Sequence, residues 1–321
     1  MNRIRSLARQ IGLAAMLSAA SVTVAAAQTE TVRVAMLAPS ALLWLHAIAE
    51  DQGFYSERDI AIEELRAQSS PALLQAVSSR SVEAGISLGD LVIRAVDQDA
   101  PIVITGAILE KTILRLVGGP DITETADLRD KVVTAGGVTG GTANLLLYQL
   151  QNAGVSSEEV QMVALTNSRD RVVALENGQV SGALLIAPFD TVAMNQGMQV
   201  LEVYTEPYVQ TPLIVNKDWA AEKPEAARAL TQALQEASNW IYEPANKDEA
   251  IRILAEYTSA EPEIAAASYT FIVEEQQAIG RNLAMPDEAL QNIADIDAAL
   301  TGEEAPTLDI GRYYDPSFLA E

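Results

Sequence analysis

Residues 131–154 read KVVTAGGVTGGTANLLLYQLQNAG, and this stretch predicts the fold. Lys131–Ala135 has the apolar character of a short buried strand, while Thr142–Ala153 places apolar residues at helical spacing. A glycine-rich loop separates the two, and Gly154 stands where a left-handed residue ends a helix. A strand, a loop and a helix in this order form the first half of a βαβ unit.

The same unit occurs 101 residues earlier in the chain. Residues 31–53 read TVRVAMLAPSALLWLHAIAEDQG, and Gly53 aligns with Gly154 without a gap. After each helix the chain continues with a short strand, a second helix and a further strand; we expect Ser69 or Ser70 to cap the second helix in the first unit and Ser168 to cap it in the second. We therefore expect two similar α/β lobes with parallel strands and right-handed crossovers. The alternative is two unrelated βαβ units, which would share part of this pattern.

Two apolar segments flank the second unit and are placed to cross between the lobes. They are the predicted strands Lys111–Val117 and Pro212–Asn216. The chain after them is almost wholly helical, and we expect this tail to pack on the first lobe. The predicted division is residues 28–115 for the first part of lobe 1, 116–210 for lobe 2, and 211–321 for the return to lobe 1.

The N-terminal segment, residues 1–27, predicts an export signal. It carries three arginines and no acid, then a mostly apolar run over residues 11–24, then Ala25–Ala27 before Gln28. A membrane anchor would need about 20 apolar residues, and this run is shorter. We expect cleavage near Ala27 and Gln28 and a periplasmic protein. Without any cysteine, it is not a lipoprotein.

Composition excludes several classes of function. The chain of 321 residues has 44 acidic against 21 basic side chains, a net charge of −23, which argues against nucleic-acid binding. It has no cysteine and one histidine, His46, so disulfide scaffolds, cysteine nucleophiles and thiolate or histidine-rich metal sites are not expected. With 49% hydrophobic residues the chain is not disordered. We expect neither a cofactor nor a metal ion.

Four segments together resemble a known group of proteins. They read GFYSERDIAIEEL, SSPALLQAVSSRSVEAGISLGD, DLRDKVVTAGGVTGGTANLLLYQLQNAGV and RVVALENGQVSGALLIAPF. In order and spacing they resemble periplasmic substrate-binding proteins of ABC importers, in the group for sulfonates, taurine, nitrate and thiamine-precursor pyrimidines. The resemblance implies a type II periplasmic-binding-protein fold, with two lobes joined by two crossing hinge strands and a ligand held between them. It also implies a monomer that delivers ligand to a membrane permease with a cytoplasmic ATPase.

The ligand is expected beyond the carboxyl ends of the parallel strands, where ligands lie in open α/β sheets. Several of these loops lead into helix N-termini, whose free N–H groups favour an anionic group. Among them the loop Gly136–Thr142 is the sharpest candidate, although its glycines would also serve an ordinary turn. The predicted ligand-binding residues of these loops are Ser40, Ser69, Ser70, Leu88, Asp90, Gly137, Thr139, Gly141, Thr142 and Asn167.

Aromatic residues near the same loops add a second kind of contact. Trp44 and Phe189, the latter following Pro188, are placed to stack on a planar ligand, with core packing as the alternative. Tyr208 and Tyr204 precede the returning hinge strand and offer hydroxyl groups. We include Trp44, Pro188, Phe189 and Tyr208 in the predicted site.

Charged residues near the loops leave the ligand class open. Asp90 and Asp190 follow corresponding strands and either bind an amine or cap the next helix. Arg115 and Arg169 are the nearest cations for an anionic ligand. The sequence thus allows a sulfonate or an aromatic heterocycle.

Two other classes of function stay open beside transport. One is a ligand sensor that engages a receptor, and the other is an exported enzyme on the same fold. No Ser/His/Asp order and no metal-ligand spacing supports catalysis. A related enzyme that makes a pyrimidine uses a histidine with clustered cysteines, which this chain lacks. We predict a binding protein and not an enzyme.

Overall fold

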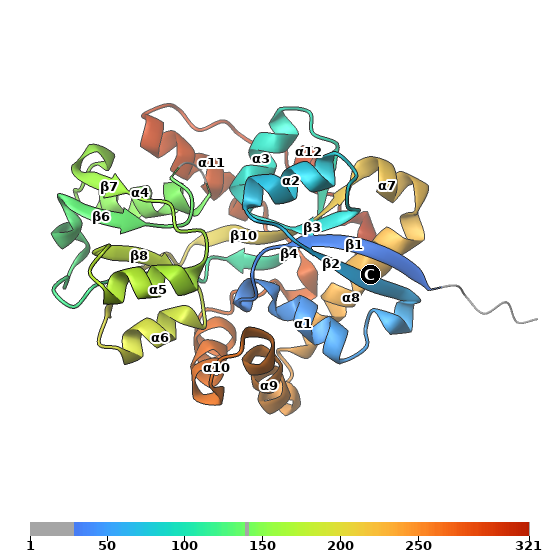
Figure 1. Ribbon diagram of the computed structural model, residues 1–321. Coiled ribbons are helices and arrows are strands. Elements are labelled where there is room, and N and C mark those ends of the chain that lie inside the picture. The colour runs from blue at the N-terminus through green and yellow to red at the C-terminus, as the bar shows by residue number, and fades with distance from the viewer. Residues whose placement is uncertain (1–28, 139–140, 321) are drawn as a thin grey trace, which may run out of the picture.

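The computed structural model describes residues 29–138 and 141–320. The predicted export signal and Thr139 lie outside the described residues. Two five-stranded sheets lie side by side, each with helices on both faces (Figure 1). We call the sheet that contains the blue N-terminal strand, together with its helices, the first lobe, and the sheet made mainly of green strands, together with its helices, the second lobe.

The first lobe has the strand order β2-β1-β3-β10-β4. Its strands are β1 (Glu30–Met36), β2 (Ile60–Arg66), β3 (Ala84–Ile86), β4 (Ile102–Lys111) and β10 (Pro207–Asn216). The three strands β1, β2 and β3 are parallel, and β10 runs antiparallel to both β3 and β4.

The second lobe has the order β7-β6-β8-β5-β9. Its strands are β5 (Arg115–Gly118), β6 (Lys131–Thr134), β7 (Val160–Met162), β8 (Gly182–Leu185) and β9 (Gln199–Val203). Again three strands are parallel, and the fourth, β5, is antiparallel to its neighbours β8 and β9. Both sheets therefore share one order and one set of directions, which confirms the predicted pair of similar lobes.

The chain crosses between the lobes twice, from β4 to β5 and from β9 to β10. The first crossing corrects the prediction of one strand over Lys111–Val117. There β4 ends at Lys111 and β5 begins at Arg115, because the intervening residues carry the chain from one sheet to the other.

Helices follow the strands as the repeat predicts. The first lobe holds α1 (Trp44–Asp51), preceded by a 3₁₀ turn (Ala41–Leu43), α2 (Ser70–Ser78) and α3 (Gly89–Asp97); the second holds α4 (Thr142–Asn152), α5 (Ser168–Glu176) and α6 (Phe189–Asn195). Local chemistry accounts for the start of α2: the Ser69 hydroxyl accepts the Ala72 N–H, and Pro71 stands in the first turn.

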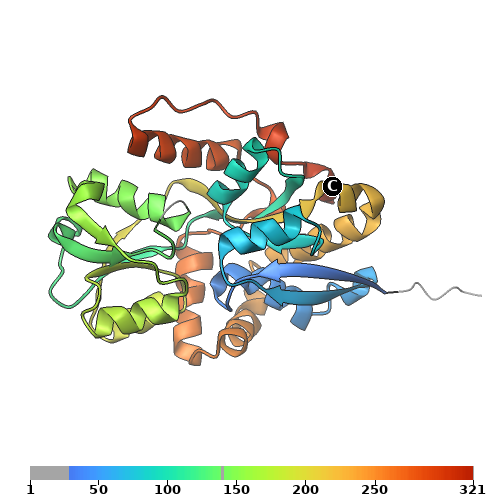
Figure 2. The same ribbon diagram turned by 45° about the horizontal axis from the view of Figure 1, so that its top comes forward.

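The C-terminal tail is helical and packs on the first lobe. Its helices are α7 (Lys217–Glu222), α8 (Pro224–Trp240), α9 (Lys247–Thr258), α10 (Pro262–Tyr269), a π-helix (Thr270–Glu275), α11 (Asp287–Thr301) and α12 (Ile310–Tyr313). Contacts of α8 and α9 with α1 confirm this expectation. Two tail helices also reach the second lobe, since α10 contacts α6 and α11 contacts α4 (Figure 2).

The apolar core does not stop at the boundary between the lobes. One cluster of buried side chains contains Ile214 of β10 in the first lobe together with Leu116 of β5 and Leu145 of α4 in the second. Burial of this shared cluster stabilises the contact between the lobes. In the part of the chain that the structure describes, no helix is long and apolar enough to span a membrane.

Candidate functional site

The first helix of each lobe donates a backbone hydrogen bond to the opposite lobe. In the first lobe the Ala41 N–H donates to the Ala187 carbonyl at 3.0 Å, and in the second the Gly141 N–H donates to the Asp90 carboxylate. These loops are the ones predicted to bind ligand, and the structure brings them face to face. We call this region, residues 40–41, 88–90, 141–142 and 187–189, the lobe junction.

Asp90 is the buried acid of the lobe junction. Only 2% of it is exposed, and its carboxylate also pairs with Arg94 one turn along α3. Arg94 bonds Asp297 of α11 as well, at 3.2 Å, and Asp297 accepts a 2.6 Å bond from the Asn144 amide on α4. Burial raises the pKa of the Asp90 carboxyl, and the charge of Arg94 opposes that rise.

Arg171 places a buried cation behind the loops of the second lobe. Its guanidinium donates to the carbonyls of Leu165, Thr166 and Leu184, at 2.8, 2.9 and 2.6 Å. Burial lowers the pKa of this group to about 10. No salt bridge to Arg171 occurs within residues 29–138 and 141–320. The second lobe therefore holds, beside the predicted ligand loops, a buried positive charge that is bonded to carbonyls and has no acidic partner among the described residues.

The loop before α4 lies directly over Arg171. The Arg171 Nη2 and Thr142 Oγ1 atoms are 3.1 and 3.4 Å from the point that a Cβ on Gly136 would occupy. Gly136 has φ of +113°, so a side chain there would be strained as well as crowded. The Thr142 hydroxyl donates to the Ala135 carbonyl, which means that in this structure it holds the loop together. Gly137, by contrast, is exposed.

The second predicted aspartate has a different partner. Asp190 stands at the second position of α6, as Asp90 does in α3, and is fully buried. Its carboxylate bonds Arg115 of the hinge strand β5 at 3.1 Å. Burial raises the pKa of the Asp190 carboxyl, and Arg115 opposes that rise. Arg115 is therefore engaged by the protein itself.

Two predicted aromatic contacts are core residues in the structure. Trp44 is 1% exposed, donates its indole N–H to the Ala250 carbonyl at 3.0 Å, and meets the Tyr269 ring edge-on at 6.0 Å. The prediction that Trp44 stacks on a ligand is therefore wrong, because helices of the tail cover it. Tyr208 is 5% exposed and packs edge-on against Tyr204, with 6.1 Å between ring centroids.

Other predicted residues serve as helix ends at the edges of the junction. Ser69 caps α2 and Asn167 caps α5, where its side chain accepts the Asp170 N–H at 2.9 Å. Ser40 is buried ahead of the 3₁₀ turn and its side chain makes no capping bond. Leu88 is half-buried, with its side chain toward Gly141 across the junction. Ser70 is the first residue of α2.

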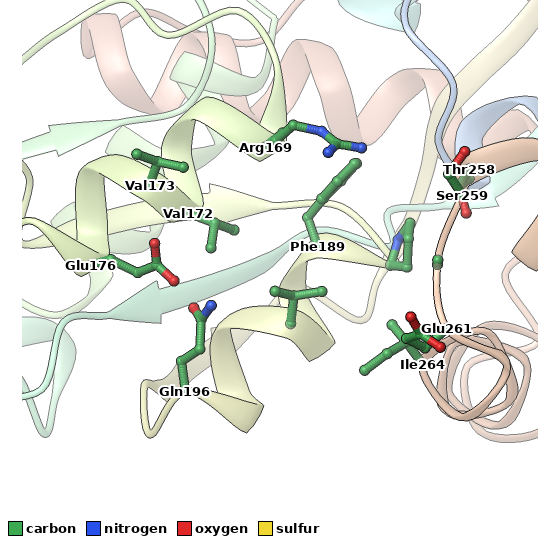
Figure 3. Close-up of a pocket in the computed structure, with 13 residues that line it drawn as sticks. Arg169, Val172, Val173, Glu176, Phe189, Gln196, Thr258, Ser259, Glu261 and Ile264 are labelled. Atoms are coloured by element: carbon green, nitrogen blue, oxygen red, sulfur yellow. The ribbon is translucent and has the colours of Figure 1, made fainter.

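A cavity of about 280 Å³ adjoins the junction at Pro188. Figure 3 shows Arg169 and Phe189 on one wall and Ser259, Glu261 and Ile264 of the tail on the other. The Arg169 guanidinium lies 5.5 Å from the Phe189 ring centroid. The structure thus brings Phe189 and Arg169 together, at the side of the junction and away from the loop before α4.

Catalytic and metal chemistry find little support among the described residues. His46 is 1% exposed and lies between the Tyr55 hydroxyl at 3.0 Å and the Glu64 carboxylate at 2.9 Å, which is a structural arrangement. The hydrogen bond from His46 lowers the pKa of the Glu64 carboxyl. In residues 29–138 and 141–320 no three His, Asp or Glu side chains are grouped to hold a metal ion.

Sequence reasoning missed the most informative side chain, Arg171. The sequence favours Arg169, which follows Ser168 directly, but Arg169 is exposed whereas the Arg171 side chain is buried. The sequence SRDR at residues 168–171 does not indicate which of the two arginine side chains is buried. Two hydroxyls near the ends of β3 and β6 were also missed: Ser87 and Thr134 are buried and have no hydrogen-bond partner among the described residues.

Comparisons with known proteins agree with this architecture. The nitrate/nitrite binding protein NrtA of Synechococcus elongatus is 26% identical over 122 residues, which are 36% of this chain and 28% of NrtA. The alkanesulfonate-binding protein SsuA of Xanthomonas axonopodis pv. citri, solved with bound MOPS, superposes with a TM-score of 0.70 at 16% identity, covering 90% of this chain and 99% of SsuA. The desulfurization enzyme DszB also has the fold, with a TM-score of 0.62 at 13% identity over 90% of this chain and 97% of DszB.

The structural likenesses confirm the predicted periplasmic-binding-protein fold. A family model described as NMT1/THI5 like matches residues 46–247, which include both crossings and the whole second lobe. The chain therefore belongs to the NMT1/THI5-like family.

Proposed function

We propose that the protein is the solute-binding component of an ABC importer and captures a small organic anion at the lobe junction. The observation that carries this proposal is the buried charge of Arg171, bonded only to carbonyls among the described residues, behind the loop that leads into α4. An anionic group at this helix N-terminus would accept hydrogen bonds from backbone N–H groups of the first turn and would lie in the field of the cation behind them.

The arrangement of the lobes supports capture by closure. The junction is made of short loops from both lobes, and in the described part of the chain the backbone passes between the lobes at the two crossings. A ligand that contacts both lobes favours the closed form by its differential affinity for that form. We propose that Ser40, Leu88, Gly137, Gly141 and Thr142 contact the ligand, with Pro188 and Phe189 at the side.

The finer parts of the proposal follow from the predicted sequence features. We propose a monomer exported to the periplasm by residues 1–27, with cleavage near Gln28, that hands its ligand to a membrane permease driven by an ATPase. We propose lobe boundaries near residues 115 and 210, as the sequence predicts. NrtA and SsuA, whose names refer to nitrate and alkanesulfonate binding, indicate where a ligand search begins.

The test is a thermal-shift screen followed by calorimetry. The probes are nitrate, methanesulfonate, taurine, benzoate and an aminopyrimidine. A ligand present at one hundred times its Kd stabilises the native protein by about 2.7 kcal/mol. A shift with the sulfonates, nitrate or benzoate supports the proposal, whereas a shift with the aminopyrimidine alone refutes the anionic class.

DszB shows that the fold is compatible with catalysis, so the same probes are also assayed for turnover. We expect each bound probe to be recovered unchanged. A product formed at a rate proportional to protein concentration would refute the proposal that the chain is a binding protein.

A further inference from the structure

The backbone N–H at the start of α4 is already bonded to an anion, and that anion is part of the protein. Gly141 donates to the Asp90 carboxylate from the opposite lobe. The first turn of α4 contains no acidic residue of its own. The acid that meets the positive end of this helix therefore comes from the first lobe.

The repeat shows that this contact is not a general feature of the fold. At the corresponding helix start of the first lobe, the Ala41 N–H meets the neutral carbonyl of Ala187. Asp190, which corresponds to Asp90, bonds Arg115. Among the described residues, the carboxylate contact is thus found at the first helix of the second lobe, the lobe that also holds the buried cation Arg171.

The Asp90 carboxylate already has partners inside the protein, although its cation, Arg94, is shared with a second acid, Asp297. Arg94 and the Gly141 N–H both bond the Asp90 carboxylate, and Asp297 bonds the other side of Arg94 while accepting from Asn144 of the second lobe. Two hydrogen bonds in this cluster thus cross between the lobes. Because an arginine and a backbone N–H already bond the Asp90 carboxylate, the geometry does not favour a ligand amine as its partner.

We propose that Asp90 is the residue that sets the specificity of the junction, because its carboxylate stands where the anionic group of the ligand binds. The Asp90 carboxylate holds the two lobes together through the Gly141 N–H. An anionic ligand binds by replacing it at the Gly141 N–H, so ligands too weak to displace a carboxylate are rejected. This inference rests on the proposed function.

The first test measures binding of nitrate, methanesulfonate and taurine to the wild-type protein, Asp90→Asn and Asp297→Asn. Like charges in contact repel strongly at a buried site, so Asp90→Asn should bind the anions about tenfold more tightly or better. Asp297→Asn is the matched control: it also removes one acid from Arg94 and keeps an acceptor for Asn144, so affinity should change by less than about twofold. Weaker or unchanged binding by Asp90→Asn would overturn the inference.

The second test needs no ligand. The chain has no cysteine, so Gln68→Cys and Ala164→Cys, both at exposed loop positions of opposite lobes, take a pair of spin labels cleanly. In the ligand-free protein we expect Asp90→Ala to lengthen and broaden the distance between the labels. Circular dichroism of both Asp90 variants establishes that they are folded.

The two tests separate the inference from the proposed function. If Asp90→Ala opens the lobes and no anion binds to any variant, the anionic ligand class is refuted and the contact between the lobes stands. If anions bind and the label distance does not change in Asp90→Ala, the role of Asp90 is refuted and the proposed function stands.

Discussion

The guanidinium carbon of Arg115 lies 3.4 Å from the centroid of the Phe271 ring. Arg115 belongs to the hinge strand β5, and Phe271 to the π-helix of the tail. On its other side Arg115 bonds the buried carboxylate of Asp190 in α6. One cation therefore connects the hinge, the second lobe and the C-terminal tail.

Replacing Arg115 by methionine should destabilise the protein by about 3–5 kcal/mol, because Asp190 would remain buried without its partner. Urea unfolding followed by circular dichroism measures the change. The double variant Arg115→Met, Asp190→Leu should recover much of the loss, since an apolar pair replaces a buried ion pair at little cost. Equal losses in the single and double variants would show that stacking on Phe271, and not the ion pair, is what Arg115 provides.

Trp44→Phe should lower the free energy of unfolding by about 1 kcal/mol, the usual net value of one hydrogen bond, because the indole N–H of Trp44 bonds the Ala250 carbonyl. The affinity for any ligand found in the screen should stay within about twofold of wild type. Calorimetry of Trp44→Phe beside Phe189→Leu gives the comparison. A loss of affinity in Trp44→Phe but not in Phe189→Leu would show that Trp44 contributes to ligand binding.

The sequence predicted the parts of the fold that depend on local chemistry. Gly53 and Gly154 both have positive φ, at +78° and +77°, and the aligned helices before them have the same place in the two sheets. Ser69 and Pro71 mark the start of α2 through a side-chain cap and a fixed φ. Such signals lie within a few residues and need no knowledge of the tertiary structure.

The candidate site was less predictable because its character depends on partners far along the chain. From the sequence, Trp44 is an aromatic residue near a ligand loop. In the structure its indole bonds Ala250, which lies 206 residues later in the chain. The sequence allows Asp90 to be a helix cap. In the structure its carboxylate accepts the N–H of Gly141, which lies 51 residues later and in the other lobe. Arg171 differs from Arg169 only in the direction of its side chain, which the packing of α5 decides.

Gly89→Ala should destabilise the protein more than Gly154→Ala, although only Gly154 has a positive φ. A Cβ on Gly89 would lie 2.2 Å from the Val209 carbonyl oxygen, so α3 would have to move away from β10. A Cβ on Gly154 meets nothing within 4 Å, so its cost is the left-handed conformation, about 1–2 kcal/mol. Melting temperatures of the two variants decide the order, and a more stable Gly89→Ala would contradict the packing of α3.

Arg171→Lys should loosen the second lobe even though the charge is kept. A lysine has no planar fork and cannot reach the carbonyls of Leu165, Thr166 and Leu184 together. Buried carbonyls left without a donor cost about 1–3 kcal/mol each. Hydrogen exchange should increase in residues 163–167 and not in the matching loop of the first lobe. Unchanged exchange would mean that these carbonyls find other donors.

Alkaline pH should unfold the protein through its buried tyrosines. Burial raises the pKa of Tyr204 and of Tyr242 to about 12, and it also raises the pKa of Tyr55 and of Tyr208 well above the ordinary tyrosine value. In the unfolded chain these groups lose their protons near pH 10, so between about pH 10 and 12 the folded state binds more protons. The free energy of unfolding must then fall as pH rises through this window.

Arg171 acts in the opposite direction, because its pKa is lowered to about 10 and the unfolded chain keeps that proton longer. Because several tyrosines oppose one arginine, we expect the free energy of unfolding to decrease with pH in this window. Urea midpoints at pH 9 and pH 11, with tyrosinate absorbance as a second probe, measure the slope. Tyr208→Phe removes one of the responsible groups and should make the slope shallower. A midpoint that does not change between the two pH values would show that these hydroxyls ionise in the folded protein as freely as in the unfolded chain.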